Sequence, residues 1–89
     1  MIYESTKEGE IVRALQPGDV ARAMHPNSTA EAWAEGSIAK ACVEGSTAKA
    51  LVAGSRAEAG VKGSRAKAWA AGSTAVAWAA GAIAIPHAV

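Results

Sequence analysis

Small and large side chains alternate along most of this chain. Counted in units of nine residues that each begin at a glycine, positions four and six are alanine in nearly all units, and position two is serine in six of them. Positions three, five, seven and nine instead vary among Thr, Ile, Arg, Lys, Glu, Trp and Leu. A period of two residues is typical of a β-strand that packs one face and exposes the other. The pattern therefore predicts one strand in every unit, with the constant small residues inside.

Each unit also begins with a residue suited to a turn. Glycine recurs every nine residues, and the one gap in the series holds asparagine, which tolerates the left-handed backbone conformation. The abundance of Ala, Glu and Lys would suit a helix, but glycines at this spacing leave helices of only about seven or eight residues, too short to be stable. We expect turns with positive φ at Gly9, Gly18, Asn27, Gly36, Gly45, Gly54, Gly63, Gly72 and Gly81.

A strand of about six or seven residues and a turn, repeated ten times without a hairpin signal, predict an all-β fold. The expected fold is a β-solenoid (β-roll or β-helix) with a thin interior of Ala, Ser and Val. One coil could hold either two units or three. Because residues one coil apart lie side by side, a two-unit coil places Arg13 beside Glu31 and Lys40 beside Glu58, whereas a three-unit coil places Arg13 beside Lys40. The charges favour about five two-unit coils over the three-unit alternative.

The first two full units differ from the others. They end in Pro17 and Pro26, and proline, which lacks the N–H for a ladder bond, is tolerated at strand ends and edges. At position eight, which the alternation places inside, Gln16 and His25 replace Ala or Val. We therefore expect residues 1–26 to form divergent coils that are wider or bent. His25 is expected to be a hydrogen-bonded structural residue rather than a ligand.

Composition limits how such a chain can be stable. The 89 residues leave room for a single domain, 1–89, whose regular repeats run over 27–89. Twenty-four residues are alanine and none is phenylalanine, so little large apolar surface is available for a core. Cys42 is the only cysteine, which excludes an internal disulfide. Association between copies remains as a source of stability, so the expected partner is the chain itself.

Charge and hydropathy exclude two other classes of partner. The formal net charge of +1 provides no basic surface that would attract nucleic acid. No window holds the roughly 20 apolar residues of a membrane span, and no signal peptide is seen. The location is left open among assembly in the cytoplasm, a phage particle and export by a route other than Sec.

Residues that could carry chemistry are few and scattered. His25 and His87 are 62 residues apart, Asp19 is the only aspartate, and no HExxH, GxSxG or P-loop motif is present. A thin solenoid also offers no concave pocket of useful volume. We therefore expect no enzyme activity, no catalytic or metal-binding residue and no cofactor. Cys42 could crosslink two chains, but a small apolar filler on a packed surface is the favoured interpretation.

Large apolar residues at position seven predict a lateral interface between copies. Two-unit coils stack Leu15, Trp33, Leu51 and Trp69 into one ladder on the outside of the solenoid, and Trp78, which is also expected outside, is assigned to the same lateral interface. Exposed tryptophans commonly anchor contacts between proteins. The alternative is that each tryptophan covers the alanine surface of its own coil.

Apolar residues at the ends predict a second, axial interface. The segment GAIAIPHAV carries no charge, and the ends of a solenoid expose unpaired strand edges. A following copy in register would place its Ile11 beside Ile83 and its Leu15 beside His87. The expected end-to-end contact consists of Ile2, Ile11, Ile83, Ile85 and Val89. The predicted function is a structural subunit of a filament or fibre, and the alternative is a rigid spacer or tip binding module of a phage or cell-surface fibre.

Two kinds of known protein share short motifs with this chain. NSTA (27–30), GSIA (36–39) and GSTA (45–48 and 72–75) resemble the repeats of trimeric autotransporter heads, a resemblance that implies a coiled chain and three copies in cross-section. The repeated Gly-Ser-Thr is also similar to ice-nucleation and insect antifreeze solenoids, whose active face needs flat threonine ladders. Because arginine interrupts both ladders at position three, ice binding is a minor alternative.

Overall fold

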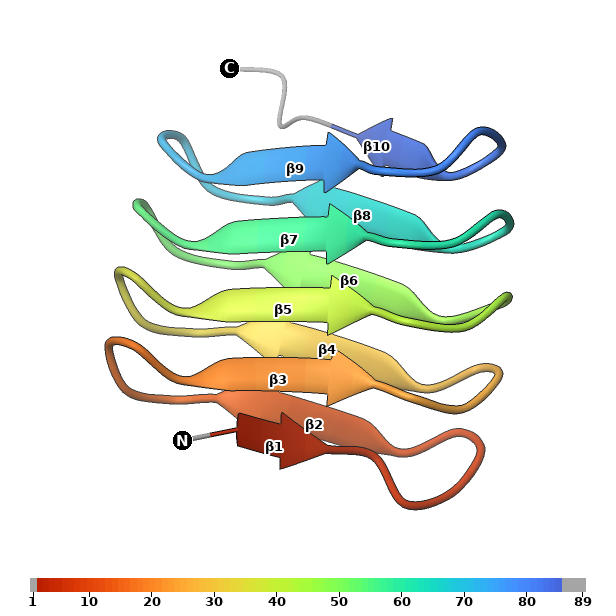
Figure 1. Cartoon of the computed structure of the whole chain (residues 1–89). Helices are drawn as coiled ribbons and strands as arrows, with labels where there is room; N and C mark the ends of the chain where they lie inside the picture. Colours follow the sequence, from red (N-terminus) through yellow and green to blue (C-terminus); the bar gives the residue numbers. More distant parts are fainter. Residues whose placement is uncertain (1, 86–89) are drawn as a thin grey trace.

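The chain coils around one axis and forms two stacked sheets (Figure 1). The computed structural model describes residues 2–85. Successive strands alternate between the sheets, so each coil adds one strand to both. The odd sheet contains β1 (Ile2–Glu4), β3 (Val20–Ala23), β5 (Ile38–Ala41), β7 (Arg56–Ala59) and β9 (Thr74–Ala77). The even sheet contains β2 (Ile11–Ala14), β4 (Thr29–Ala32), β6 (Thr47–Ala50), β8 (Arg65–Ala68) and β10 (Ile83–Ile85).

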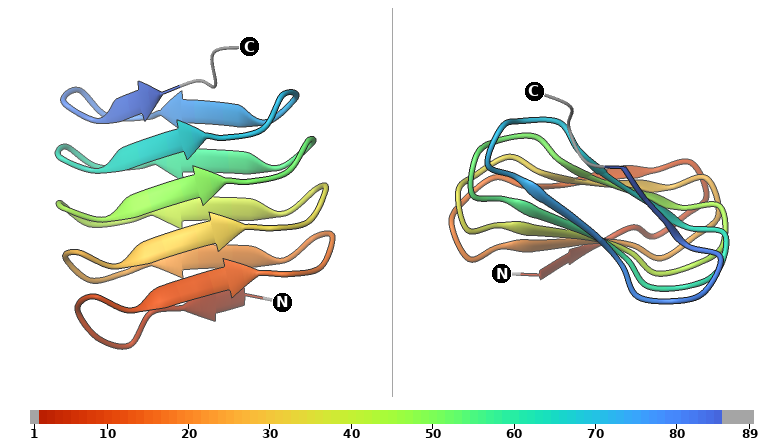
Figure 2. Two further views of the ribbon diagram at one scale, coloured as in Figure 1. Left: turned by 180° about the vertical axis from the view of Figure 1, so that it is seen from behind. Right: turned by 90° about the horizontal axis from the view of Figure 1, so that it is seen from above.

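The register within each sheet is two units. Neighbouring strands run parallel, with Arg13 beside Glu31 in the even sheet and Lys40 beside Glu58 in the odd sheet. The β-solenoid with two units per coil is therefore confirmed, and the three-unit coil is excluded. Figure 2 shows the two sheets back to back, with strands of opposite direction.

The interior consists of alanine and serine. The alanines at positions four and six of the middle coils have no exposed surface, among them Ala39, Ala48 and Ala57 at 0%. The largest fully buried side chains of the described residues are five serines of position two: Ser28, Ser37, Ser46, Ser55 and Ser64. In the middle coils, where only methyl groups fill the space between the sheets, a larger inward side chain would force the sheets apart. The expected thin interior is confirmed for alanine and serine.

Valine at position eight does not belong to that interior, which corrects the expectation for this position, whereas Val12 at position four packs against the alanine core. Val43, Val52 and Val61 are only partly buried. The strands of the regular units are shorter than expected, at four residues each, because the chain already bends at position eight. The corner takes up the remaining residues, and the alternation of inside and outside ends where the strand does.

Each corner is a tight turn that explains the regular glycines. The N–H of Ser46 donates to the carbonyl of Val43 at 3.1 Å, and Gly45, which lies between these two residues, has φ +83°. Asn27 adopts φ +62° at the equivalent position and is the only described non-glycine residue with positive φ. The residue before it therefore has negative φ, and this combination defines a type II turn. The positive φ is confirmed at all nine expected positions.

The two prolines belong to the same regular turns. Pro17 and Pro26 each precede the residue with positive φ, which is the place where type II turns favour proline. Their interpretation as strand-end devices was wrong, because a residue with φ fixed near about −65° fits this position without disturbing any ladder. At the N-terminal edge, Tyr3 occupies the inward position held by Ala21 in the next coil.

Serine at position two closes the turn from inside. Ser46 Oγ donates to the carbonyl of Val43 at 2.5 Å and accepts a hydrogen bond from the N–H of Val43 at 3.3 Å. Ser37, Ser55, Ser64 and Ser73 make the same two bonds. A buried hydroxyl is thus satisfied in both roles, which explains why a polar residue recurs in an alanine interior.

Candidate functional site

The expected apolar column forms on the outside of the even sheet, and we call Leu15, Trp33, Leu51 and Trp69 the tryptophan ladder. The N–H of Trp33 donates to the carbonyl of Ala14 at 2.8 Å, so position seven continues the strand ladder beyond β4. Leu15, Trp33 and Trp69 are 63%, 44% and 49% exposed, whereas Leu51 is partly buried. The even sheet, seen from outside in the left view of Figure 2, thus carries large apolar surface that its own coils do not cover.

Charged residues at position five fix how the indole rings lie. Glu31 Oε1 accepts hydrogen bonds from Arg13 Nε at 3.0 Å and from Trp33 Nε1 at 2.9 Å. The Nζ atoms of Lys49 and Lys67 each lie 5.9 Å from the centre of the Trp69 ring. Both lysines also lie side by side in register, and their attraction to the ring offsets this like-charge contact. Both indoles therefore lean over the sheet toward position five.

Trp78 lies on the opposite side of the solenoid from the other two tryptophans. It follows β9, so it belongs to the odd sheet, and its N–H donates to the carbonyl of Ala59 at 2.9 Å. It is the most exposed of the large hydrophobic residues described, at 65%. One flat lateral contact cannot include both Trp78 and the tryptophan ladder. The two-unit coil by itself predicts this separation, because Trp69 and Trp78 are one unit apart and successive units belong to opposite sheets.

Cys42 is at position seven of the odd sheet and is partly buried. Its Sγ lies 4.0 Å from the carbonyl oxygen of Lys40. Desolvation by burial raises the pKa of the Cys42 thiol above its usual value, although Arg22 and Lys40 act in the opposite direction. A thiol that remains protonated is a poor nucleophile. This supports the interpretation as a small filler.

His25 has a structural role in the first coils. Its Nδ1 lies 3.2 Å from Ser5 Oγ, which also accepts a hydrogen bond from the N–H of Met24 at 2.8 Å. Ser5 Oγ therefore links the His25 ring to the backbone of Met24. The expected hydrogen-bonded histidine is confirmed.

The two ends of the solenoid expose different residues. At the C-terminal end, β9 and β10 each pair with a strand on one side only, and Ile83 and Ile85 are 45% and 42% exposed. At the N-terminal end, Ile2 and Ile11 are 55% and 52% exposed on the edge strands β1 and β2. Val89 and His87, which we also assigned to the axial contact, lie outside the described residues.

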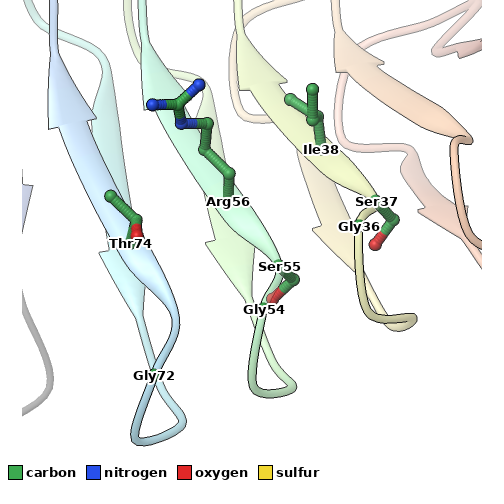
Figure 3. A pocket seen from close by; sticks show the side chains of 8 residues that line it. All are labelled: Gly36, Ser37, Ile38, Gly54, Ser55, Arg56, Gly72 and Thr74. Carbon is green, nitrogen blue, oxygen red and sulfur yellow. The ribbon is translucent and has the colours of Figure 1, made fainter.

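Shallow grooves of about 300 Å³ lie along the corners, although a thin solenoid is expected to offer no concave pocket of useful volume. In the groove of Figure 3, the side chains of Ile38, Arg56 and Thr74 stand on three successive strands, so arginine does interrupt this position-three ladder. The hydroxyls of Ser37 and Ser55 there are held in turn hydrogen bonds. The groove lining therefore combines no nucleophile with a neighbouring base.

Neither a metal site nor a membrane-spanning helix is found in residues 2–85. No three His, Cys, Asp or Glu side chains of this part lie close enough to hold a metal ion. No helix there has the length and apolar character that crossing a membrane requires. Comparison with protein-family models, with curated proteins and with solved structures finds no match to this chain.

Proposed function

We propose that this protein is a structural subunit that assembles end to end into a fibre and packs laterally through the tryptophan ladder. The observation that carries the proposal is the change in burial of the inward alanines. Ala57 and Ala66 in the fourth coil have no exposed surface, whereas Ala75 and Ala84 in the last are partly exposed and Ala77 is exposed. An interior that continues to the edge of β9 and β10 is a template for further coils.

Another copy of the chain can supply those coils without changing the register. Its β1 would extend the odd sheet beyond β9, and its β2 would extend the even sheet beyond β10. With the same two-unit offset, Ile83 would lie beside Ile11 of the following copy, and Ile85 beside its Arg13. The isoleucine pair supports this joint, because apolar side chains one coil apart bury each other.

A pair of substitutions at Ile85 tests the axial joint. Ile85→Lys would place a positive charge beside Lys67 of its own chain and Arg13 of the following copy, so fibres should be lost. Ile85→Glu would place a negative charge between the same two cations, so fibres should persist. Ile85 is exposed, so both variants should fold, which circular dichroism can verify.

Negative-stain microscopy of the purified chain is the readout. The expected result is long fibres of uniform width, with a repeat of about 24 Å that five coils at the usual strand spacing would give. Discrete particles at all protein and salt concentrations would overturn the filament and favour the spacer or tip module instead. Equal behaviour of the two Ile85 variants would contradict the proposed register.

A further inference from the structure

The tryptophan ladder alternates in size along the solenoid axis, and this alternation restricts how two copies can pack. From β2 to β8 the order is Leu15, Trp33, Leu51, Trp69. A twofold or threefold symmetry axis parallel to the solenoid axis keeps each side chain level with the equivalent side chain of every other copy. When that axis passes over position seven, tryptophan meets tryptophan and leucine meets leucine, so the layers are alternately overfilled and underfilled.

A twofold axis along the strand direction removes this mismatch. When the axis lies midway between β4 and β6, it reverses the heights of the second copy. Trp33 then faces the partner's Leu51, and Leu15 faces the partner's Trp69. Each large side chain meets a smaller one, which is the complementarity that a packed interface needs.

The charges of position five favour the same axis. A parallel twofold axis that passes over position five instead would place Arg13, Glu31, Lys49 and Lys67 opposite themselves, so that every pair repels. In the antiparallel arrangement Glu31 faces the partner's Lys49 at the centre, and Lys49 faces the partner's Glu31. The outer pair, Arg13 with the partner's Lys67, is like-charged, but Arg13 is already bonded to Glu31 and its side chain is 54% exposed to screening solvent.

The two central groups are used differently by their own fold. The hydrogen bonds from Arg13 and Trp33 both go to Glu31 Oε1, and within residues 2–85 none engages Oε2, but the Glu31 side chain is only 11% exposed. Lys49 has no ion pair in the same part of the chain, although its ammonium lies near Trp69. Each copy thus presents one cation without an ion pair and one largely covered acceptor, which the partner's lysine would reach through Oε2.

We propose that two copies pack even sheet against even sheet in this antiparallel arrangement. The inference rests on the lateral contact of the proposed function and specifies its symmetry. The molecule measures 27 Å in both of its long dimensions, so one broad face offers an area approaching the roughly 800 Å² per partner of a standard interface. We therefore expect a dimer of moderate affinity.

Sedimentation equilibrium of the full chain, below the concentration at which fibres form, tests the arrangement. Lys49→Glu should weaken the dimer at least tenfold, because the Glu31 carboxylate of each copy would then face a carboxylate of the other copy. Adding Glu31→Lys to that variant exchanges the two charges and should restore dimerisation. Lys40→Glu, on the odd sheet, is the matched control and should leave the dimer unchanged. Circular dichroism checks that each variant folds, and Lys49→Gln serves as the milder variant if Lys49→Glu does not.

Each outcome either supports or overturns the antiparallel pair. A trimer, a monomer at all concentrations, or a dimer indifferent to Lys49→Glu and Lys49→Gln would overturn it. Failure of the double variant to recover would do so as well, provided that it folds. Fibre formation is scored separately by microscopy: fibres one solenoid wide would refute the lateral pair and leave the axial assembly standing, while dimers without fibres would do the reverse.

Discussion

The middle of this solenoid and its two ends follow different rules. In the middle, every coil repeats the same turn, the same buried serine and the same inward alanines, and only the outer residues vary. At the N-terminal end, Tyr3 replaces an inward alanine and Glu4, Lys7 and Glu8 add charge around the edge strands. At the C-terminal end the alanine interior continues to the edge, with isoleucine outside.

This difference shows which part of a repeat protein carries specific information. The middle coils bury one another, so their sequence needs only to repeat. An end coil lacks one neighbour and must either cover the edge or present it to another chain. The first coil departs from the repeat, whereas β9 and β10 keep the repeat and lose the charges of position five, where Val76 and Ile85 stand. The ends, rather than the middle, therefore distinguish an assembling solenoid from an isolated one.

The largest effect is expected from enlarging an inward alanine. Ala48→Leu adds three heavy atoms to a site with 0% exposure between two closely packed sheets, and should destabilise the fold by at least about 3 kcal/mol. Ala84→Leu, at a partly exposed inward position of β10, should cost less than about 1 kcal/mol. Thermal and urea unfolding followed by circular dichroism at low protein concentration measures both. Equal losses would show that the C-terminal edge is as closed as the middle.

A smaller effect is expected from removing a turn hydroxyl. Ser46→Ala deletes the two hydrogen bonds that Ser46 Oγ makes with the N–H and the carbonyl of Val43. Because Ser46 is fully buried, water cannot replace its hydroxyl, and the loss should destabilise the fold by about 1–3 kcal/mol. Ser73→Ala deletes the same two bonds to Ala70, but Ser73 is only partly buried, so solvent can replace them. Urea titration should therefore give a clearly smaller loss for Ser73→Ala. The reverse order would refute the role assigned to burial.

The smallest effect is expected at the charged N-terminal edge. Glu4 pairs with Arg22 Nη1 at 3.2 Å, and the two side chains are 48% and 34% exposed. Exposed ion pairs contribute little, so Glu4→Gln should change the free energy of unfolding by less than about 1 kcal/mol. The same unfolding assay at low and high salt provides the measurement. A larger loss would mean that the first coil depends on its charges and not only on stacking.

Much of the fold could be predicted from local rules. A glycine or asparagine every nine residues demands positive φ at nine turns, and alternation of period two identifies the inward alanines. The charges of position five even selected the two-unit coil, since Arg13 and Glu31 attract only in that register. These features depend on the backbone and on neighbouring strands, so each repeat contains enough information to specify them.

Features that depend on the path of the chain at the corners were not predicted. The chain bends at position eight, which shortens the strands and places Val43, Val52 and Val61 outside the core. Pro17 was assigned to a strand end, although it fits the second position of the same turn as in every other unit. The alternation of small and large residues continues in the sequence beyond position six, where the extended backbone of the strand ends, so the pattern alone does not show where each strand stops.

The sequence by itself determined a coil of nine-residue units, its turn residues and its narrow interior, because these follow from backbone conformation and side-chain size repeated at a fixed period. Only the tertiary structure decided what the outside presents. It brought Arg13 Nε and Trp33 Nε1 to the same carboxylate oxygen of Glu31. It also left the inward alanines of the last coil partly uncovered. Such features depend on which coils are neighbours and on how side chains lean across adjacent strands, which no single repeat contains.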